Sequence, residues 1–240
     1  MTHDAVRPTH DEYVAINSAN MIIAIDGPAG AGKSTIAKRV AKALGFLYID
    51  TGAMYRALTF KSLEEKAPPF DQEAVIQLAR KTTIDLRSTP NGSIQVLLDG
   101  KDVSSDIRLP RVSAHVSDVA KIKEVREIMI AKQQHLGRQP NSVMDGRDIG
   151  TVVFPQAEFK FYLDASITER ARRRHEELTG MGQEVSLSAV EKDLSNRDHI
   201  DSTRVFAPLK RADDALYIDT TAMSIEEVTQ TLLQVIHKHD

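Results

Sequence analysis

The sequence contains no cysteine among its 240 residues. Without thiols the chain can form neither a disulfide framework nor a thiolate metal site, so its chemistry depends on oxygen and nitrogen groups. The formal net charge of only -3 at pH 7 gives no reason to expect a nucleic-acid-binding protein. The chain also lacks internal repeats and low-complexity tracts. What is left is an ordinary globular composition, with 41% hydrophobic and 27% charged residues.

The first twenty residues contain no apolar run, and they include three acidic residues and two histidines. This composition argues against a signal peptide or a membrane anchor. We therefore expect residues 1–20 to form a flexible, solvated tail before one folded domain, residues 21–240. With no targeting segment, the expected protein is cytoplasmic and monomeric, and it does not bind membranes.

Short apolar runs alternate with stretches of helical periodicity along most of the chain, which favours an α/β fold with a doubly wound parallel sheet. Ligands bind at the carboxyl ends of the strands in such sheets. The predicted five strands are Met21–Ile25, Phe46–Ile49, Ser142–Met144, Phe159–Leu163 and Ala215–Ile218. The predicted helices are Ser34–Leu44, Ala53–Glu65, Glu73–Arg80 after a Pro68-Pro69 break, and Val112–Leu136.

The pattern changes to strand-like alternation between about residues 82 and 110. Ile84 and Leu86 alternate with polar residues, Pro90-Asn91-Gly92 marks a turn, and a second β run spans Ile94–Leu98. This segment is therefore predicted to be a small antiparallel β insert within the α/β fold.

The first strand is followed by a G-x-x-x-x-G-K-[ST] motif, which opens the first helix. In this P-loop, glycines let successive backbone amides curl around phosphate oxygens, and the helix N-terminus adds partial positive charge. Lys33 is expected to reach the β- and γ-phosphates of ATP, and the Ser34 hydroxyl to ligate Mg²⁺. The predicted ATP-binding residues are Gly27, Pro28, Ala29, Gly30, Ala31, Gly32, Lys33, Ser34 and Thr35.

Two further motifs follow strands at the same expected edge of the sheet. Asp50-Thr51-Gly52-Ala53-Met54-Tyr55-Arg56 places Arg56 in the first turn of a helix, where a guanidinium can hold a phosphate through two hydrogen bonds. Asp145-Gly146-Arg147-Asp148 follows the Ser142–Met144 strand. Asp145 is placed to organise Mg²⁺ and its waters, Arg147 to bind a phosphate, and Asp148 to accept from a base amino group, although an internally satisfied Asp-Arg pair is the alternative.

A predicted helical lid spans about residues 167–196, with a break at Gly180-Met181-Gly182. Its first helix, Ile167–Leu178, contains four arginines, which can neutralise charge on the transferred phosphoryl group. Arg170 and Arg174 share one face at i,i+4 spacing, and Arg172 and Arg173 cannot both join them. Arg197, Asp201 and Arg204 follow this lid and form either a phosphate and sugar site or an exposed ion-pair network.

Taken together, these motifs resemble the bacterial type of cytidylate kinase, within the nucleoside monophosphate kinase family. The resemblance covers more than nine-tenths of the chain from about Met21. Its most specific parts are DTGAMYR, DGRDIGTVVFP and the β insert; the others are IDGPAGAGKST, VLLDGKDVSSDIR, LDAS-x-x-ER-x-RR, NRDHIDSTR and APL…AD-A-IDTT.

The resemblance implies a P-loop nucleoside triphosphate hydrolase fold and transfer of the γ-phosphoryl of Mg-ATP to CMP or dCMP. It implies catalytic roles for Lys33, Arg147, Arg170 and Arg174. It also assigns the acceptor phosphate to Thr51, Tyr55, Arg56 and Arg147, the cytosine edge to Ser117, Arg126 and Asp148, and the sugar and phosphate to Arg197, Asp201 and Arg204.

Two other functions fit the P-loop itself. One is a kinase for a small metabolite or another nucleotide, which would make the cytosine-reading set accidental. The other is a nucleotide-dependent switch without an acceptor. The sequence has no N-K-x-D-like guanine-specifying motif, and an arginine-rich lid has no purpose in a simple switch.

Overall fold

The computed structural model describes residues 21–65, 71–89, 94–138 and 141–238. The predicted tail of residues 1–20, the Pro68-Pro69 break and the Pro90-Asn91-Gly92 turn lie outside the described residues. None of the described helices is long and apolar enough to span a membrane.

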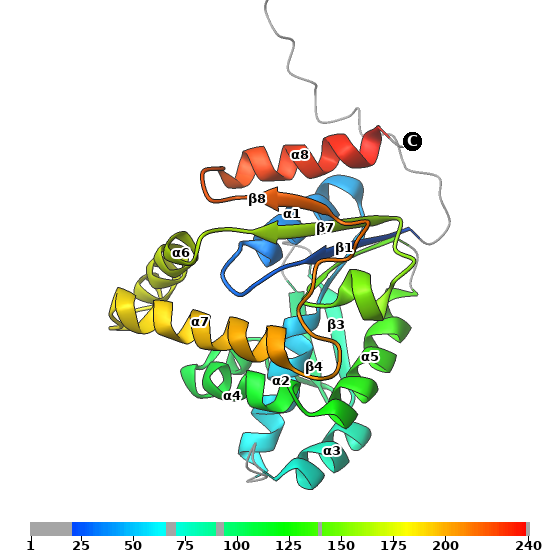
Figure 1. The fold of residues 1–240 in the computed structure, drawn as a ribbon. Helices are drawn as coiled ribbons and strands as arrows, with labels where there is room; N and C mark the ends of the chain where they lie inside the picture. The colour runs from blue at the N-terminus through cyan, green and yellow to red at the C-terminus, as the bar shows by residue number, and fades with distance from the viewer. Residues whose placement is uncertain (1–20, 66–70, 90–93, 139–140, 239–240) are drawn as a thin grey trace, which may run out of the picture.

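The centre of the molecule is a five-stranded sheet in which every neighbouring pair of strands is parallel (Figure 1). The strand order is β2-β6-β1-β7-β8, so the first strand is central and its neighbours come from the second half of the chain. This confirms the predicted fold class. The strands are β1 (Ile22–Asp26), β2 (Leu47–Asp50), β6 (Ser142–Gly146), β7 (Phe159–Asp164) and β8 (Leu216–Asp219).

Both faces of this sheet are covered by helices, as a fully buried parallel sheet requires. On β1, Ile23 and Ile25 belong to one apolar cluster and Ala24 to the other, because successive side chains of a strand point to opposite faces. Helices α1 (Lys33–Leu44) and α8 (Ile225–His237) contribute to the first cluster. The second cluster includes residues of α2 (Thr51–Glu64), α3 (Gln72–Lys81), α4 (Pro110–Ala120) and α5 (Lys123–Gly137).

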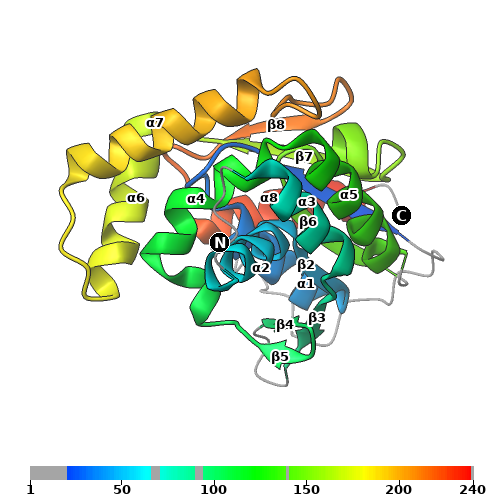
Figure 2. The same cartoon turned by 90° about the horizontal axis from the view of Figure 1, so that it is seen from below.

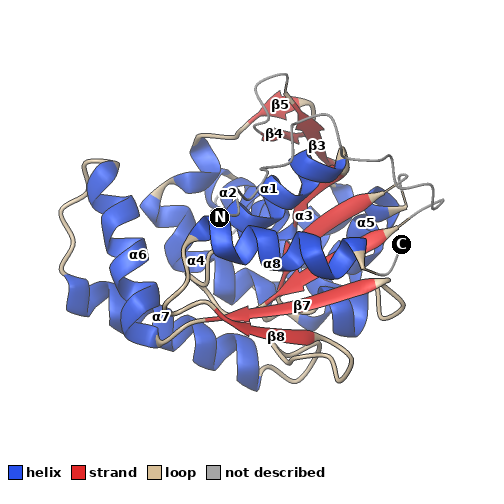
Figure 3. Cartoon of the chain, turned by 90° about the horizontal axis from the view of Figure 1, so that it is seen from above, coloured by secondary structure: helices blue, strands red, loops and turns tan. Residues whose placement is uncertain are grey.

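The predicted insert is a separate antiparallel sheet, set apart from the main one (Figure 3). It contains β3 (Ile84–Ser88), β4 (Ile94–Leu98) and a short third strand, β5 (Lys101–Asp102), which the sequence pattern did not predict. Asp99 and Gly100 both have positive φ, 49° and 83°, as a tight two-residue hairpin turn requires. The insert ends in a short 3-10 turn, Asp106–Arg108.

The predicted helix Val112–Leu136 is two helices, α4 and α5, rather than one. Ile122 interrupts it in an extended conformation, with φ -69° and ψ 118°, and acts as the N-cap residue of α5. The apolar periodicity continues across the break because Val119, Ile122 and Val125 are all buried in the same cluster.

A helical arm projects beyond the sheet and consists of α6 (Ile167–Gly180) and α7 (Leu187–Thr203) (Figure 2). Ser166 and Ser186 cap these helices by accepting hydrogen bonds from backbone amides. Helix α7 extends past the predicted end at Asn196, so Arg197 and Asp201 belong to the helix and do not follow it. A small apolar cluster of Ala171, Val190 and Leu194 packs against Ala29 of the P-loop.

Candidate active site

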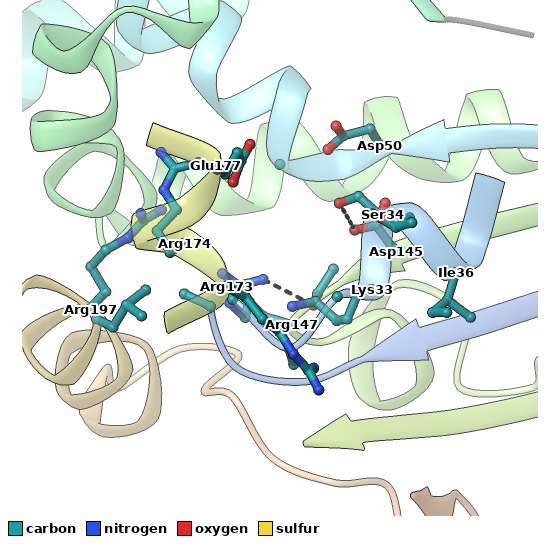
Figure 4. A pocket seen from close by; sticks show the side chains of 18 of the residues that line it. Lys33, Ser34, Ile36, Asp50, Asp145, Arg147, Arg173, Arg174, Glu177 and Arg197 are labelled. Carbon is teal, nitrogen blue, oxygen red and sulfur yellow. Dashed lines mark hydrogen bonds and ion pairs between the residues drawn. The ribbon is translucent and has the colours of Figure 1, made fainter. Parts of the chain in front are cut away.

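One cavity of about 860 Å³ lies between the P-loop, the carboxyl ends of β2 and β6, α4 and the helical arm. Eleven lysines and arginines and seven acidic residues line it, so this cavity carries an excess of positive charge although the whole chain is acidic. In Figure 4, Arg174 and Arg197 of the arm lie on one side, and Ser34 and Asp145 lie on the other. Such a cavity is suited to anionic ligands.

The P-loop has the backbone geometry of a phosphate cradle. Gly27, Gly30 and Gly32 have φ of 147°, 79° and 84°, a region that side chains with a Cβ oppose. A Cβ on Gly27 would also lie 2.0 Å from the carbonyl oxygen of Leu163. Gly30, Ala31 and Gly32 line the cavity, and no side chain caps the N-terminus of α1. The first-turn amides of α1 are thus available to an anion.

Lys33 is the buried cation of this cradle. Its side chain is folded over the loop, and Nζ donates a hydrogen bond to the Pro28 carbonyl oxygen at 2.6 Å. Burial, together with the neighbouring Arg147 guanidinium, lowers the pKa of Lys33 to about 7. A bound polyphosphate would supply the negative charge that this ammonium group lacks and would favour its protonated form.

Ser34 and Asp145 form a pair of oxygen ligands next to the cradle. The Ser34 hydroxyl donates to Asp145 Oδ2 at 2.8 Å, and the Tyr48 hydroxyl donates to Oδ1 at 2.7 Å. The Thr51 hydroxyl holds the same residue through its backbone carbonyl at 2.7 Å. Burial, and then the charge of Asp50, raises the pKa of Asp145 to about 6. This carboxylate is held in place from β2 and α1, and the charge of Lys33 favours its ionised form.

Asp50 positions Arg56 on the opposite wall. Asp50 caps α2 by accepting from the Ala53 amide at 2.7 Å, and its other oxygen forms an ion pair with Arg56 at 3.0 Å. The ion pair leaves Arg56 only 24% exposed in its side chain and holds it at the cavity wall. Because the pair is partly buried, the guanidinium is ordered before any ligand arrives.

Asp148 and Arg126 form a buried ion pair at the acceptor end of the cavity. Arg126 Nη2 lies 2.5 Å from Asp148 Oδ2, and the two side chains are 2% and 7% exposed. The Arg126 guanidinium also lies 5.4 Å from the centroid of the Tyr55 ring. Arg204 Nη2 is 3.7 Å from the other oxygen of Asp148. The sequence alone did not pair Asp148 with Arg126, although both were predicted as site residues.

Asp201 joins two of the predicted arginines. Arg147 Nε donates to Asp201 Oδ2 at 2.9 Å, and Arg204 Nη1 donates to Oδ1 at 3.1 Å. These two guanidinium groups hold the pKa of Asp201 below its usual value against the opposing effect of burial. Arg197 lies on the same helix with its side chain 18% exposed, and desolvation lowers its pKa, as does the nearby Arg147. Asp201 and Arg204 are buried, so these two do not form the exposed ion-pair network considered above.

Several polar atoms near these ion pairs are buried and have no hydrogen-bond partner. Among the described residues they include Tyr55 Oη, Arg126 Nε, Arg197 Nε and Arg204 Nη2. Buried polar groups are nearly always paired in proteins, so this cluster of donors in one cavity suits a ligand that has acceptor atoms.

The four arginines of α6 do not face the cavity in the way that their spacing predicted. Arg172, Arg173 and Arg174 line the cavity, whereas Arg170 does not. Arg170 Nη1 instead donates to the Ala29 carbonyl oxygen at 3.0 Å and to Asp198 Oδ2 at 2.5 Å, and Nε donates to the Ala165 carbonyl oxygen at 2.9 Å. The guanidinium docks the arm onto the P-loop in this structure, and its catalytic role stays a prediction.

The remaining predicted residues are placed around the same cavity. Ala29, Thr35 and Ser117 line it, whereas Gly27 and Pro28 do not. Sequence reasoning missed several lining residues whose side chains come from distant segments: Arg108, Ser113, Thr220, Met223 and Ile225. It also missed three acidic residues that pair with site residues: Asp26, Asp50 and Asp198. Asp26 is the last residue of β1, and Asp50 is the last residue of β2.

Comparison with known proteins places the chain in a family. The sequence model of the family described as "Cytidylate kinase" matches residues 23–238. The cytidylate kinase of Caldanaerobacter subterraneus subsp. tengcongensis is 52% identical over 90% of this chain and 95% of the relative. That of Geobacillus sp. strain WCH70 is 50% identical over 91% of this chain and 97% of the relative.

Among solved structures, an uncharacterized protein from Eubacterium ventriosum superposes with a TM-score of 0.50 at 11% identity, over 91% of this chain and 99% of the other. A likeness at that identity concerns the fold alone. The family match and the two relatives span nearly the whole folded chain, including every cavity-lining motif described above. The chain belongs to the cytidylate kinase family.

Proposed function

We infer that this chain transfers the γ-phosphoryl group of ATP to CMP or dCMP, giving ADP and CDP or dCDP. The observation that carries the inference is one cavity with a phosphate cradle at one end and unpaired, buried donors at the other. The family to which the chain belongs agrees with it. A nucleotide-dependent switch that binds no acceptor would not require the unpaired donors at the second end of the cavity.

The donor half of the cavity is the P-loop. The amides of Gly30, Ala31 and Gly32 and the ammonium group of Lys33 are the groups that would bind the phosphates of ATP. Ser34 and Asp145 fit a magnesium ion, because Mg²⁺ in phosphotransferases is bound by few protein oxygens and by substrate phosphates and water. We assign Ser34 as a direct ligand and Asp145 as a ligand through water. A metal ion held there would neutralise charge on the phosphates of ATP.

The acceptor half takes the nucleoside monophosphate. Arg56 and Arg147 would hold its phosphate beside Thr51 and Tyr55, since guanidinium groups bind phosphate oxygens in pairs. Arg197, Asp201 and Arg204 would bind the sugar and phosphate. Ser117, Arg126 and Asp148 would read cytosine, whose amino group needs an acceptor and whose carbonyl oxygen and ring nitrogen need donors.

The reaction itself requires little covalent chemistry from the protein. An ionised phosphate oxygen of the acceptor forms a bond to the γ-phosphorus while the bond from that phosphorus to the leaving ADP oxygen breaks. The nucleophile is already ionised near neutral pH, so no general base is needed. The protein contributes alignment of the two phosphates and charge neutralisation by Lys33, Arg147 and the arm arginine Arg174. Closure of the arm would exclude water, which would otherwise hydrolyse ATP.

Replacing Asp148 with alanine should erode the preference for CMP over UMP. The carboxylate is the proposed acceptor for the amino group that cytosine carries and uracil lacks. Losing it should lower the ratio of the kcat/KM values for CMP and UMP by about tenfold or more, because a site that pairs a polar group rejects ligands lacking that group. Steady-state kinetics with both acceptors measure the ratio.

Asp148→Asn is the second variant, because asparagine has nearly the same shape as aspartate. Its amide oxygen can still accept a hydrogen bond from Arg126, whereas alanine offers Arg126 no acceptor. Asp213→Asn, at an exposed position outside the cavity, is the control and should keep the wild-type ratio. A wild-type ratio in both Asp148 variants would show that another residue reads the base.

Replacing Arg170 with alanine should loosen the arm without removing a substrate contact. The change removes hydrogen bonds to Ala29 and Asp198, which join α6, α7 and the P-loop. We expect the KM for ATP to rise by about tenfold, since a buried charged hydrogen bond contributes on that order, and amide hydrogen exchange in α7 to become faster. Kinetics and hydrogen exchange measure the two effects.

Arg39→Ala removes a surface ion pair with Glu226 and is the matched arginine control. Unchanged exchange in α7 of Arg170→Ala would contradict the docking role that the contacts indicate.

The proposed reaction is tested by incubating the protein with Mg-ATP and CMP and quantifying both products. CDP and ADP should form in equal amounts. ADP formation without CDP would show hydrolysis only, and the acceptor assignment would fail.

A further inference from the structure

Asp26 is a buried carboxylate for which the proposed mechanism has no use. It is the last residue of β1, directly before Gly27 of the P-loop, and it is 5% exposed. In the sheet register it lies beside Gly146 of β6, at the start of the segment that carries Arg147 and Asp148. Asp26 does not line the cavity, so it cannot act by touching a substrate there.

Both oxygens of this carboxylate bind backbone amides of one neighbouring segment. Oδ1 accepts from the Ile149 amide at 2.8 Å, and Oδ2 accepts from the Gly150 amide at 2.7 Å. These amides begin a single π-helical turn, Ile149–Val153, which is an uncommon conformation. Burial raises the pKa of Asp26 to about 7, whereas the two amides oppose that rise. The carboxylate thus joins the strand that begins the P-loop to the turn after Asp148.

The two residues immediately before this turn are Arg147 and Asp148. Their side chains depend on partners from other elements, Arg147 on Asp201 and Asp148 on Arg126. These hydrogen-bonded ion pairs depend on the relative position of the two side chains. A shift of the backbone at Ile149 would therefore disturb both the Arg147–Asp201 pair and the Asp148–Arg126 pair. The P-loop has its own support from β1 and α1 and does not depend on the turn in the same way.

We propose that Asp26 is a positioning residue that fixes the acceptor-binding Arg147 and Asp148 relative to the P-loop, so that the two substrate phosphates meet in line. The proposal rests on the proposed function, since it assigns Arg147 and Asp148 to CMP. On the acceptor side, Asp26 acts through the backbone of residues 149 and 150. Its loss should therefore affect the acceptor more than the donor.

Two substitutions separate geometry from charge. Asp26→Asn keeps the shape of the side chain but replaces one carboxylate oxygen with an NH₂ group. One of the two backbone amides, Ile149 or Gly150, then has no oxygen to which it can donate. It also removes negative charge near Lys33, on whose pKa Asp26 acts. Asp26→Glu keeps that charge and displaces the carboxylate by one methylene. A positional role predicts the same defect in both variants, whereas a role through Lys33 predicts a defect in Asp26→Asn alone.

The experiment measures CMP binding and ADP binding separately by titration calorimetry, without turnover, in the wild type and both variants. We expect the dissociation constant for CMP to rise by about tenfold, as the loss of one buried hydrogen bond allows, and that for ADP to change by less than about twofold. The kcat should fall together with the CMP preference over UMP. Ile23→Val, in the same strand, lowers stability without touching the turn and should leave both binding constants unchanged.

Equal losses of ADP and CMP affinity, or a normal CMP constant in Asp26→Glu, would overturn the proposal. Should Asp26→Asn not fold, Asp26→Glu alone tests the proposal, because it keeps the negative charge and displaces the carboxylate from the two amides. Wild-type protein that does not bind CMP at all would refute the proposed function instead.

Discussion

Lys33→Ala is expected to reduce kcat by about a thousandfold, because preorganised charges that stabilise a transferring phosphoryl group contribute on that order. Lys33 is buried at 5% exposure in the P-loop, and no second lysine of the described chain occupies the loop. The positive charge therefore has no nearby substitute of the same kind. Single-turnover measurements at saturating ATP and CMP separate this loss of rate from a loss of ATP binding.

Lys42→Ala provides a matched control in the same helix. Lys42 lies in the last turn of α1, is exposed and does not line the cavity. Its removal should leave kcat within about twofold of the wild type, since surface substitutions away from functional features have small effects. Comparable rates for Lys33→Ala and Lys42→Ala would contradict the assignment of Lys33 to the transferred phosphoryl group.

Arg147→Ala is expected to lower kcat/KM for CMP by about a thousandfold, since an arginine on the transferred charge can contribute that much. Arg147 lies between the two halves of the cavity and is held by Asp201 at 2.9 Å and by the Gly146 carbonyl oxygen at 3.3 Å. Arg147→Lys should recover little activity, because an ammonium group cannot make the paired, planar contacts of a guanidinium. Steady-state kinetics over a range of CMP concentrations give both values.

The arginine control for this experiment is Arg80→Ala, at the exposed end of α3 and outside the cavity. It should behave like the wild type. Full activity of Arg147→Lys would mean that a positive charge alone is sufficient at this position. The paired, planar contacts of a guanidinium group would then not be needed.

The central fold was predictable because its signals are local. Five short apolar runs gave five strands with boundaries shifted by one or two residues. The glycines of the P-loop were recognisable because only such residues allow the observed positive φ angles. The break between α4 and α5 was not predictable, since Ile122 is apolar and satisfies the helical pattern while adopting extended backbone.

The candidate site was predictable as a list of residues but not as a network. Asp148 and Arg126 are 22 residues apart and Tyr48 and Asp145 are 97 apart, so their pairing depends on the strand order, which a single sequence does not state. One signal was available: Asp26, Asp50 and Asp145 each lie at or near the carboxyl end of a strand, where ligands bind in such sheets.

The arginines of α6 show a further limit. Helical spacing correctly indicated that Arg170 and Arg174 lie one turn apart, but it could not show which face of α6 turns toward the P-loop. That face is set by Asp198 on α7 and by the Ala29 carbonyl oxygen, both distant in sequence. Arg170 thereby docks the arm, while Arg174 lines the cavity and pairs only with the exposed Glu177 among the contacts described.

The most direct test of the account is ADP release from Mg-ATP with CMP, dCMP, UMP, AMP and GMP offered separately at equal concentration. We expect strong turnover with CMP and dCMP and clearly weaker turnover with UMP, because uracil lacks the amino group for which Asp148 is the proposed acceptor. Equal or faster turnover with UMP or a purine monophosphate would contradict the base assignment, and turnover with none of the five would contradict the proposed reaction.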